Sequence, residues 1–251
     1  MLTDGTNYLR SSISHSGKSS SPTLPLSMAS GEPGPVPLPP AMPGSVVLLQ
    51  LLVSSSVVDL HVVTEVIRND VGLVVAVLRT AGLEYGRRSS TSLSIADLVV
   101  RMGLEKLKCL AMETALIRLQ RRPGQVAGCE RFWAHARLTA GIAEGLAGQT
   151  VPANREDAYI AGLLHRVGAL PALLGWEIPG LETRDEAAAG YRLAKAWQLP
   201  DFLADVILGD PRDCNSRLAY SLLNVVESAE ERAGQLESIG KDEDVATQAW
   251  C

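Results

Sequence analysis

From residue 44 to about residue 115, apolar side chains recur every three or four positions along the chain. The stripes of this kind are Val62, Val63, Val66 and Ile67; Leu73, Val74, Val77 and Leu78; Ile95, Leu98, Val99 and Met102; and Leu107, Leu110, Ala111, Thr114 and Ala115. This is the period of an amphipathic helix, whereas a half-buried strand alternates with a period of two. Residues 71–77 are rich in valine, which also suits a strand, but their four-residue repeat favours a helix.

Polar and conformationally special residues stand where these helices are expected to begin and end. Asp59 and Ser94 occupy N-cap positions, and Ser94 with Asp97 forms a candidate capping box. The residues at which we expect helices to break or end are Gly72, Gly82, Gly103 and Pro123.

The second half of the chain shows the same period in longer segments. The predicted helices span residues 126–146, 155–174, 184–197, 200–208 and 214–233. We expect the 155–174 segment to bend near Gly168 and Pro171, and Pro200 to stand in the first turn of its helix, where its missing N–H costs little. With no internal repeat and no convincing strand pair in the sequence, the pattern predicts an all-α protein.

Residues 1–43 differ in composition from the rest of the chain. They are rich in Ser, Pro and Gly and end in GEPGPVPLPPAMP at residues 31–43. Such a segment buries too little apolar surface to offset the entropy of ordering, so we predict a disordered arm that ends in an extended proline segment. A ligand for a proline-binding groove is an alternative for its PxxP pattern. The predicted division is an arm at 1–43, a helical domain at 44–233 and a polar, flexible tail at 234–251.

Composition and charge narrow the classes of function. The net charge of −5 argues against nucleic-acid binding, which usually requires a basic surface. The apolar run at residues 46–53 is far shorter than the ~20 residues of a membrane span, and no signal-peptide pattern precedes it. The four cysteines form neither a CxxC pair nor a zinc-type spacing with histidine. We expect a cytoplasmic protein that binds neither nucleic acid nor membrane and needs no cofactor.

The four histidines are the first candidates for catalytic or metal-binding residues. His15 lies in the predicted arm and His61 at the start of a helix, whereas His135 and His165 lie within helices, in FWAHARL and AGLLHRVG. Taken alone, a single helical histidine is more often a packed or partly exposed residue than a ligand.

Several segments resemble the HDOD family, a branch of the HD superfamily of helical phosphohydrolases. AGLLHRVGAL at residues 161–170 is similar to the GLLHDIG signature of that superfamily. The segments similar to HDOD motifs, in the order of the family, are LRTAGLEYG at 78–86, SIADLVVRMGLEKLKCLAM at 94–112, FWAHARLTAGIAEGLA at 132–147 and GYRLAKAWQLPDFLADVI at 190–207. The resemblance covers about residues 37–233 and implies an all-α, multi-helix HD-like bundle.

The resemblance also implies a degenerate metal site. HD phosphohydrolases hold a divalent metal ion with a histidine, an adjacent His-Asp pair and a distal aspartate; His135 and His165 match the two histidines, but Arg166 stands in place of the paired aspartate. The later family motifs lack their histidines, reading Asp185, Glu186 and Gly190, and then Gly209 and Asp210. Two histidines without a carboxylate make a poor site for a hard metal ion, so we expect no metal, no cofactor and no catalysis.

Two other functions then remain for the chain. If the cleft persists, His135, His165 and Arg166 border a cationic site for an anionic nucleotide; alternatively Arg166 pairs with an acidic residue of a neighbouring helix and closes it. The broader hypothesis is a bacterial signal-transduction module of the HDOD type, with protein partners and with homo-oligomerisation as an option. Residual metal-dependent phosphohydrolase activity is the least favoured alternative.

The loop LLGWEIPGLET, residues 173–183, offers a candidate contact surface for such partners. Its apolar residues Trp176, Ile178 and Leu181 are the ones we expect to lie on that surface. A structural role for Trp176 at the edge of the core is an equal alternative.

Overall fold

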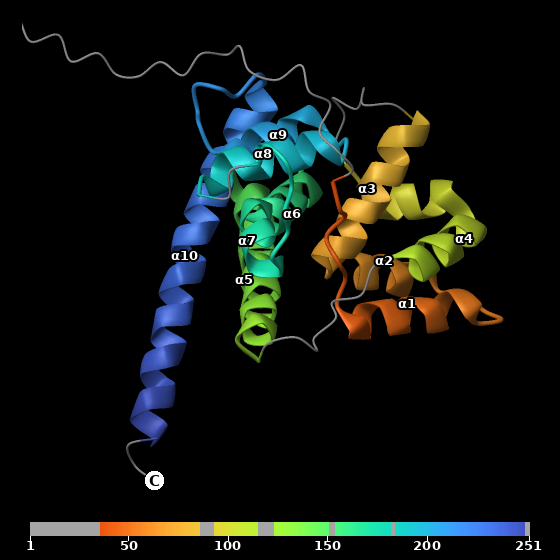
Figure 1. Ribbon diagram of the computed structural model, residues 1–251, viewed down its shortest axis with the longest axis horizontal. Helices are drawn as coiled ribbons and strands as arrows, with labels where there is room; N and C mark the ends of the chain where they lie inside the picture. The colour runs from red at the N-terminus through yellow and green to blue at the C-terminus, as the bar shows by residue number, and fades with distance from the viewer. Residues whose placement is uncertain (1–35, 86–92, 115–122, 151–153, 182–183, 249–251) are drawn as a thin grey trace, which may run out of the picture. The chain divides into compact units, whose positions relative to one another are not determined.

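The computed structural model describes residues 36–85, 93–114, 123–150, 154–181 and 184–248. Its elements are α1 (Pro43–Ser54), α2 (Leu60–Arg68), α3 (Val71–Tyr85), α4 (Ile95–Glu113), α5 (Pro123–Thr150), α6 (Arg155–Leu164), the 3-10 turn η1 (Val167–Ala169), α7 (Leu170–Leu174), α8 (Glu186–Ala196), α9 (Asp201–Leu208) and α10 (Arg217–Gln248). Every element of the described residues is thus a helix, which confirms the predicted all-α class (Figure 1).

Helices α1 to α4 pack on one another, and the predicted apolar stripes lie on α2, α3 and α4. Val62 of the first stripe is exposed, and Ala115 of the last lies outside the described residues. The Val-rich segment is helical, and its residues Leu73, Val74, Val75 and Val77 are all fully buried. The predicted caps are present: Asp59 accepts hydrogen bonds from the first backbone N–H groups of α2, and Ser94 accepts one from Asp97 in α4. Periodicity therefore located α2, α3 and α4, and the capping residues located the starts of α2 and α4.

Three glycines and one proline were expected to interrupt helices, and only part of that expectation is correct. Gly103 has a positive φ and kinks α4, and Pro123 begins α5. Gly72 and Gly82 lie within α3 instead, where neighbouring backbone leaves no room for a side chain. A Cβ at Gly72 would lie 2.6 Å from the carbonyl oxygen of Pro40, and one at Gly82 would lie 2.9 Å from that of Gln198.

The segment 36–42 carries the predicted extended conformation but is fixed to the helices. The Met42 N–H donates to the buried carboxylate of Asp70, and the Trp197 indole N–H donates to the carbonyl oxygen of Pro37 at 2.9 Å. This end of the proline segment therefore joins α3 to the C-terminal half of the domain. The rest of the predicted arm, residues 1–35, lies outside the described residues.

Helices α5, α6 and α10 form the part of the domain that contains His135 and His165, with α8 and α9 packed at one end (Figure 1). The predicted bend in the 155–174 segment divides it into α6, η1 and α7. Helix α10 continues past Ala233 to Gln248, so residues 234–248 of the predicted flexible tail are helical in this structure. The division into arm, domain and tail otherwise remains a prediction.

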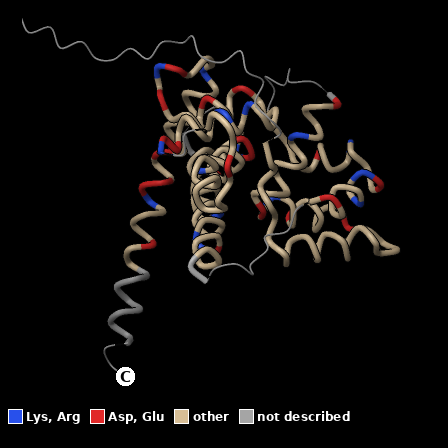
Figure 2. Tube along the Cα trace, viewed as in Figure 1, with Lys and Arg blue, Asp and Glu red and all other residues tan. Residues whose placement is uncertain are grey.

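Charged residues of both signs are dispersed over the described helices other than α1, which carries none (Figure 2). Within the described ranges, no helix is both long enough and apolar enough to cross a membrane. Cys109, Cys129 and Cys214 carry free thiols.

Candidate functional site

A close crossing of α5 and α6 brings the two candidate histidines together. A Cβ at Gly162 of α6 would lie 3.0 Å from the Cα of Ala140 and 3.1 Å from the Cβ of Ala143, both on α5. His135 lies about one turn before this contact on α5, and His165 directly follows α6. Their ring centroids are 5.7 Å apart, so the structure places the pair as the motif predicts.

Helix α10 supplies a carboxylate between the two rings. One oxygen of Glu230, Oε2, lies 2.7 Å from His135 Nε2 and 2.8 Å from His165 Nε2. The neighbouring Ala229 and Ala233 are fully buried, and their small side chains let α10 approach closely. The side chain of Glu230 is 37% exposed, whereas those of His135 and His165 are 14% and 9% exposed. We call these three residues the His–Glu–His cluster.

The other ring nitrogens of the cluster also have partners. His135 Nδ1 lies 2.9 Å from a carboxylate oxygen of Glu237, which is two helical turns beyond Glu230 on α10. His165 Nδ1 lies 2.6 Å from the carbonyl oxygen of Gly162. Each of the four ring nitrogens therefore faces an oxygen acceptor, with Glu230 Oε2 shared by two of them. A protonated His135 ring, with an N–H at both positions, can donate to Glu230 and Glu237 at once. The contact with Glu237 also anchors α10 beyond the predicted end of the domain.

Arg166 reaches the same cluster from η1. Gly168 and Gly190 are in close contact, since a Cβ at Gly168 would lie 2.8 Å from the backbone nitrogen of Gly190. This contact brings α8 beside Arg166, whose guanidinium lies 3.5 Å from a Glu186 oxygen and 3.9 Å from Glu230 Oε1. The sequence left open whether Arg166 lines a cationic cleft or pairs with acids of neighbouring helices, and in the structure it forms these pairs.

The ion pairs of the cluster shift the proton affinities of its members. The hydrogen bonds from His135 and His165 hold the pKa of Glu230 far below its ordinary value of 4.5. The hydrogen bond to Glu230 raises the pKa of His135 above its ordinary value of 6.5, although partial burial opposes this. Both directions favour a carboxylate paired with a protonated imidazole.

These shifts predict a stability optimum in mildly acidic solution. The raised pKa of His135 gives a contribution that is complete below pH 6.5 and is lost as the pH rises through the folded-state value. The lowered pKa of Glu230 gives one that is present above pH 4.5 and is lost as the pH falls. The free energy of unfolding, measured in urea, is therefore expected to be highest between pH 4.5 and pH 6.5. It is expected to fall toward pH 9 by on the order of 1 kcal/mol.

The matched control separates the cluster from the other titrating groups. His135→Gln is expected to flatten the alkaline fall, whereas His61→Gln, at an exposed position on α2, is expected to retain it. Equal pH profiles for His135→Gln and the wild type would show that the pairing with Glu230 contributes nothing.

By donor type and distance, the cluster also fits a divalent metal ion. The two histidine nitrogens and a Glu230 oxygen lie within 4.8 Å of one another, and two histidines with one glutamate are a known zinc ligand set. The partners of both Nδ1 atoms would fix the rings with Nε2 toward an ion. An ion held there would act as a Lewis acid or lower the pKa of a bound water. The guanidinium of Arg166 opposes it with a fixed positive charge.

Glu230 was not predicted from the sequence, and the expectation of two histidines without a carboxylate was wrong. Glu230 and Glu237 are seven residues apart and so lie on one face of α10, but an acidic pair of this kind is usually a solvated surface. Of the other positions compared with the family, Asp185 caps α8 and Asp210 pairs with Arg212. Glu186 alone among them reaches the site, through Arg166.

The three residues of the predicted contact surface lie at the edge of the hydrophobic core. Trp176, Ile178 and Leu181 are partly buried and pack against the hydrophobic core. This geometry matches the structural alternative for Trp176 at the core edge, and a role in partner binding remains a prediction. Among the described residues, the more exposed apolar side chains include Val47, Leu48 and Leu51 of α1.

The described helices form a bundle in which two crossing helices bring a pair of histidines together. A family profile described as the HDOD domain matches residues 39–176, more than half of the chain. The chain belongs to the HDOD family, as its sequence motifs predicted. The match ends before α8, so Glu230 lies beyond it.

Solved structures agree with this fold. The MmoQ response regulator from Methylococcus capsulatus aligns at 18% identity and a TM-score of 0.59, over 78% of this chain and 86% of that one. A structure of its fragment 20–298 aligns at 16% identity and a TM-score of 0.55, over 77% and 83%. At such identities the likeness to these two structures shows the fold alone. An HDOD domain protein of unknown function from Geobacter sulfurreducens aligns at 23% identity over 79% of this chain and 74% of that one, and its TM-score of 0.35 adds nothing to the comparison of folds. The comparison with curated proteins found no match.

Proposed function

We propose that the chain is a non-catalytic regulatory module that acts through contacts with protein partners. The observation that carries the proposal is the position of Glu230, whose carboxylate joins His135 and His165 where the HD superfamily holds its metal ion. Arg166, in place of the metal-binding aspartate, adds a permanent positive charge beside it. The cluster then links α5, α6 and α10 through ion pairs and hydrogen bonds, which is a structural role.

The family and the fold support a role in signalling. The similar MmoQ protein is described as a response regulator. The proposed route is contact with protein partners on other chains or with a second copy of this chain.

An anionic nucleotide is the less favoured ligand for the cluster. The positive charge of Arg166 is offset by Glu186 and Glu230, and Glu237 adds a further carboxylate on the far side of His135. A phosphate placed among three carboxylates meets repulsion as well as attraction.

A metal-dependent phosphohydrolase is the second candidate, and the ligand set of two histidines and Glu230 is the observation that favours it. The experiment that separates the two candidates is turnover of bis(p-nitrophenyl) phosphate with added Mn²⁺, Fe²⁺ or Ni²⁺. We expect no turnover above the rate without protein, because three ligands beside a guanidinium bind such ions weakly. The control is Arg166→Asp, which restores the His-Asp pair and is expected to bind these ions more tightly.

Turnover by the wild-type protein that is lost in His165→Ala would overturn the non-catalytic proposal. Turnover that persists in His165→Ala would come from a contaminating hydrolase and would leave the proposal standing.

A further inference from the structure

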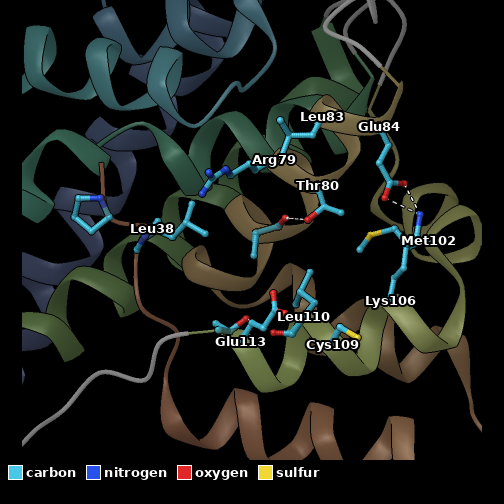
Figure 3. Close-up of a pocket in the computed structure, with 14 residues that line it drawn as sticks. Leu38, Arg79, Thr80, Leu83, Glu84, Met102, Lys106, Cys109, Leu110 and Glu113 are labelled. Atoms are coloured by element: carbon cyan, nitrogen blue, oxygen red, sulfur yellow. Dashed lines mark hydrogen bonds and ion pairs between the residues drawn. The ribbon is translucent and has the colours of Figure 1, made fainter. Parts of the chain in front are cut away.

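A cavity lies between helices α3 and α4 and the extended segment 37–39, among residues that do not belong to the His–Glu–His cluster (Figure 3). Its volume is about 590 Å³, within the range of cavities that bind small molecules, roughly 300–1,000 Å³. Much of its wall is apolar and includes Leu38, Leu83, Met102 and Leu110. Such a wall favours the apolar body of a ligand over a fully hydrated ion.

The charged groups of the cavity differ in how they are paired. Lys106 Nζ lies 2.6 and 2.7 Å from the two carboxylate oxygens of Glu84, so these two charges offset each other. Figure 3 shows this pair on one side of the cavity and Arg79 on the opposite side, near Leu38. Glu113, also in the lining, is exposed to solvent, where water weakens its field.

Arg79 is the lining residue with an unsatisfied donor. Its Nε is buried and has no hydrogen-bond partner in the part of the chain that the structure describes. A buried donor without a partner costs about 1–3 kcal/mol, and the guanidinium forms its strongest hydrogen bonds with carboxylate, sulfonate or phosphate oxygens. The buried Nε is out of reach of a ligand in the open cavity. An anionic group at this side would instead pair with the terminal nitrogens of the Arg79 guanidinium, for which the structure gives no ion pair among the described residues.

We propose that this cavity binds a small amphipathic anion, with the anionic head at Arg79 and the apolar body along Leu38, Leu83 and Leu110. The cavity is already formed without a ligand, because hydrogen bonds from Met42 to Asp70 and from Trp197 to Pro37 hold the 37–39 wall in place. A preformed site loses little free energy to ordering when the ligand enters. This binding site goes beyond the proposed regulatory function, since a small-molecule ligand is added to the protein partners.

The test uses 8-anilinonaphthalene-1-sulfonate, an amphipathic anion whose fluorescence rises in an apolar site. N-phenyl-1-naphthylamine, which has the same aromatic body without the sulfonate, is the uncharged control ligand. We expect saturable 1:1 binding of the sulfonate to the wild-type protein. Arg79→Gln is expected to weaken the sulfonate at least tenfold and to change the affinity of the uncharged amine less than twofold.

Matched variants show whether the effect belongs to this cavity. Glu113→Gln changes a charge in the same lining and is expected to leave sulfonate binding unchanged or stronger. Leu51→Gln alters an exposed apolar residue of α1, outside the cavity, and is expected to change nothing. Leu83→Gln, at a lining residue that is 58% exposed and so tolerant of substitution, is expected to weaken both ligands.

Cys109 gives a second measurement that does not depend on the Arg79 variant. Its thiol is free, exposed and part of the cavity lining, whereas Cys214 is outside the lining. Saturating sulfonate is expected to slow alkylation of Cys109 by N-ethylmaleimide severalfold, measured by peptide mass spectrometry, and to leave Cys214 unaffected. Sulfonate fluorescence that does not saturate, equal affinity in Arg79→Gln, or unprotected Cys109 would each overturn the proposal.

Discussion

Replacement of Gly168 by alanine is expected to destabilise the domain by about 3 kcal/mol or more, because the new methyl group meets backbone rather than flexible side chain. Its Cβ would lie 2.7 Å from the carbonyl carbon of Glu186 and 2.8 Å from the backbone nitrogen of Gly190. Helix α8 would have to move away from η1, and Arg166 would lose its position beside Glu186. The measurement is the free energy of unfolding in urea.

Gly145→Ala is the matched control for this substitution. Gly145 lies within α5, and a Cβ there would have no heavy atom within 4 Å. Because alanine favours a helix over glycine by up to about 1 kcal/mol, this variant is expected to be as stable as the wild type or more so. If both alanines have the same small effect, α8 and η1 are not in the contact described.

Replacement of Glu230 by alanine is the second large effect. It removes the carboxylate that accepts hydrogen bonds from His135 and His165, and it leaves two imidazoles and the guanidinium of Arg166 without their shared anion. Since Glu230 is partly exposed, we expect a loss of about 2 kcal/mol rather than the larger cost of a fully buried ion pair. The pKa of His135, followed by NMR, is expected to fall at the same time.

The neighbouring Glu231 offers a control of equal charge and helix position. It is exposed on α10, and Glu231→Ala is expected to change stability by less than about 0.5 kcal/mol. A Glu230→Ala variant as stable as Glu231→Ala, with an unchanged His135 titration, would show that the cluster does not link the helices.

The helices were predictable because their signals are local. The four-residue repeat of 71–77, the caps at Asp59 and Ser94 and the interruption near Gly168 each depend on a few neighbouring residues. Gly72 and Gly82 were wrongly predicted to interrupt helices, because their role depends on contacts that are not local. Whether such a glycine ends a helix or admits a neighbouring backbone depends on Pro40 and Gln198, which are distant in sequence.

The candidate site was only half predictable for a similar reason. The family motifs identified His135, His165 and Arg166, all of which meet in the structure. Glu230 lies 95 residues from His135 and 65 from His165, and neither spacing nor motif connects it to them. Only the packing of α10 on α5 and α6 makes this glutamate a partner of the histidines and supplies the carboxylate that the sequence analysis took to be missing.

Glu230 and Arg166 are proposed to occupy the place of a metal ion rather than help to hold one. Calorimetric titration of Zn²⁺ into metal-free protein at neutral pH tests this most directly, because zinc suits a set of two histidines and one glutamate better than the other ions do. We expect no saturable binding tighter than about 0.1 mM. One Zn²⁺ bound per chain at nanomolar concentrations, and lost in His165→Ala, would contradict it.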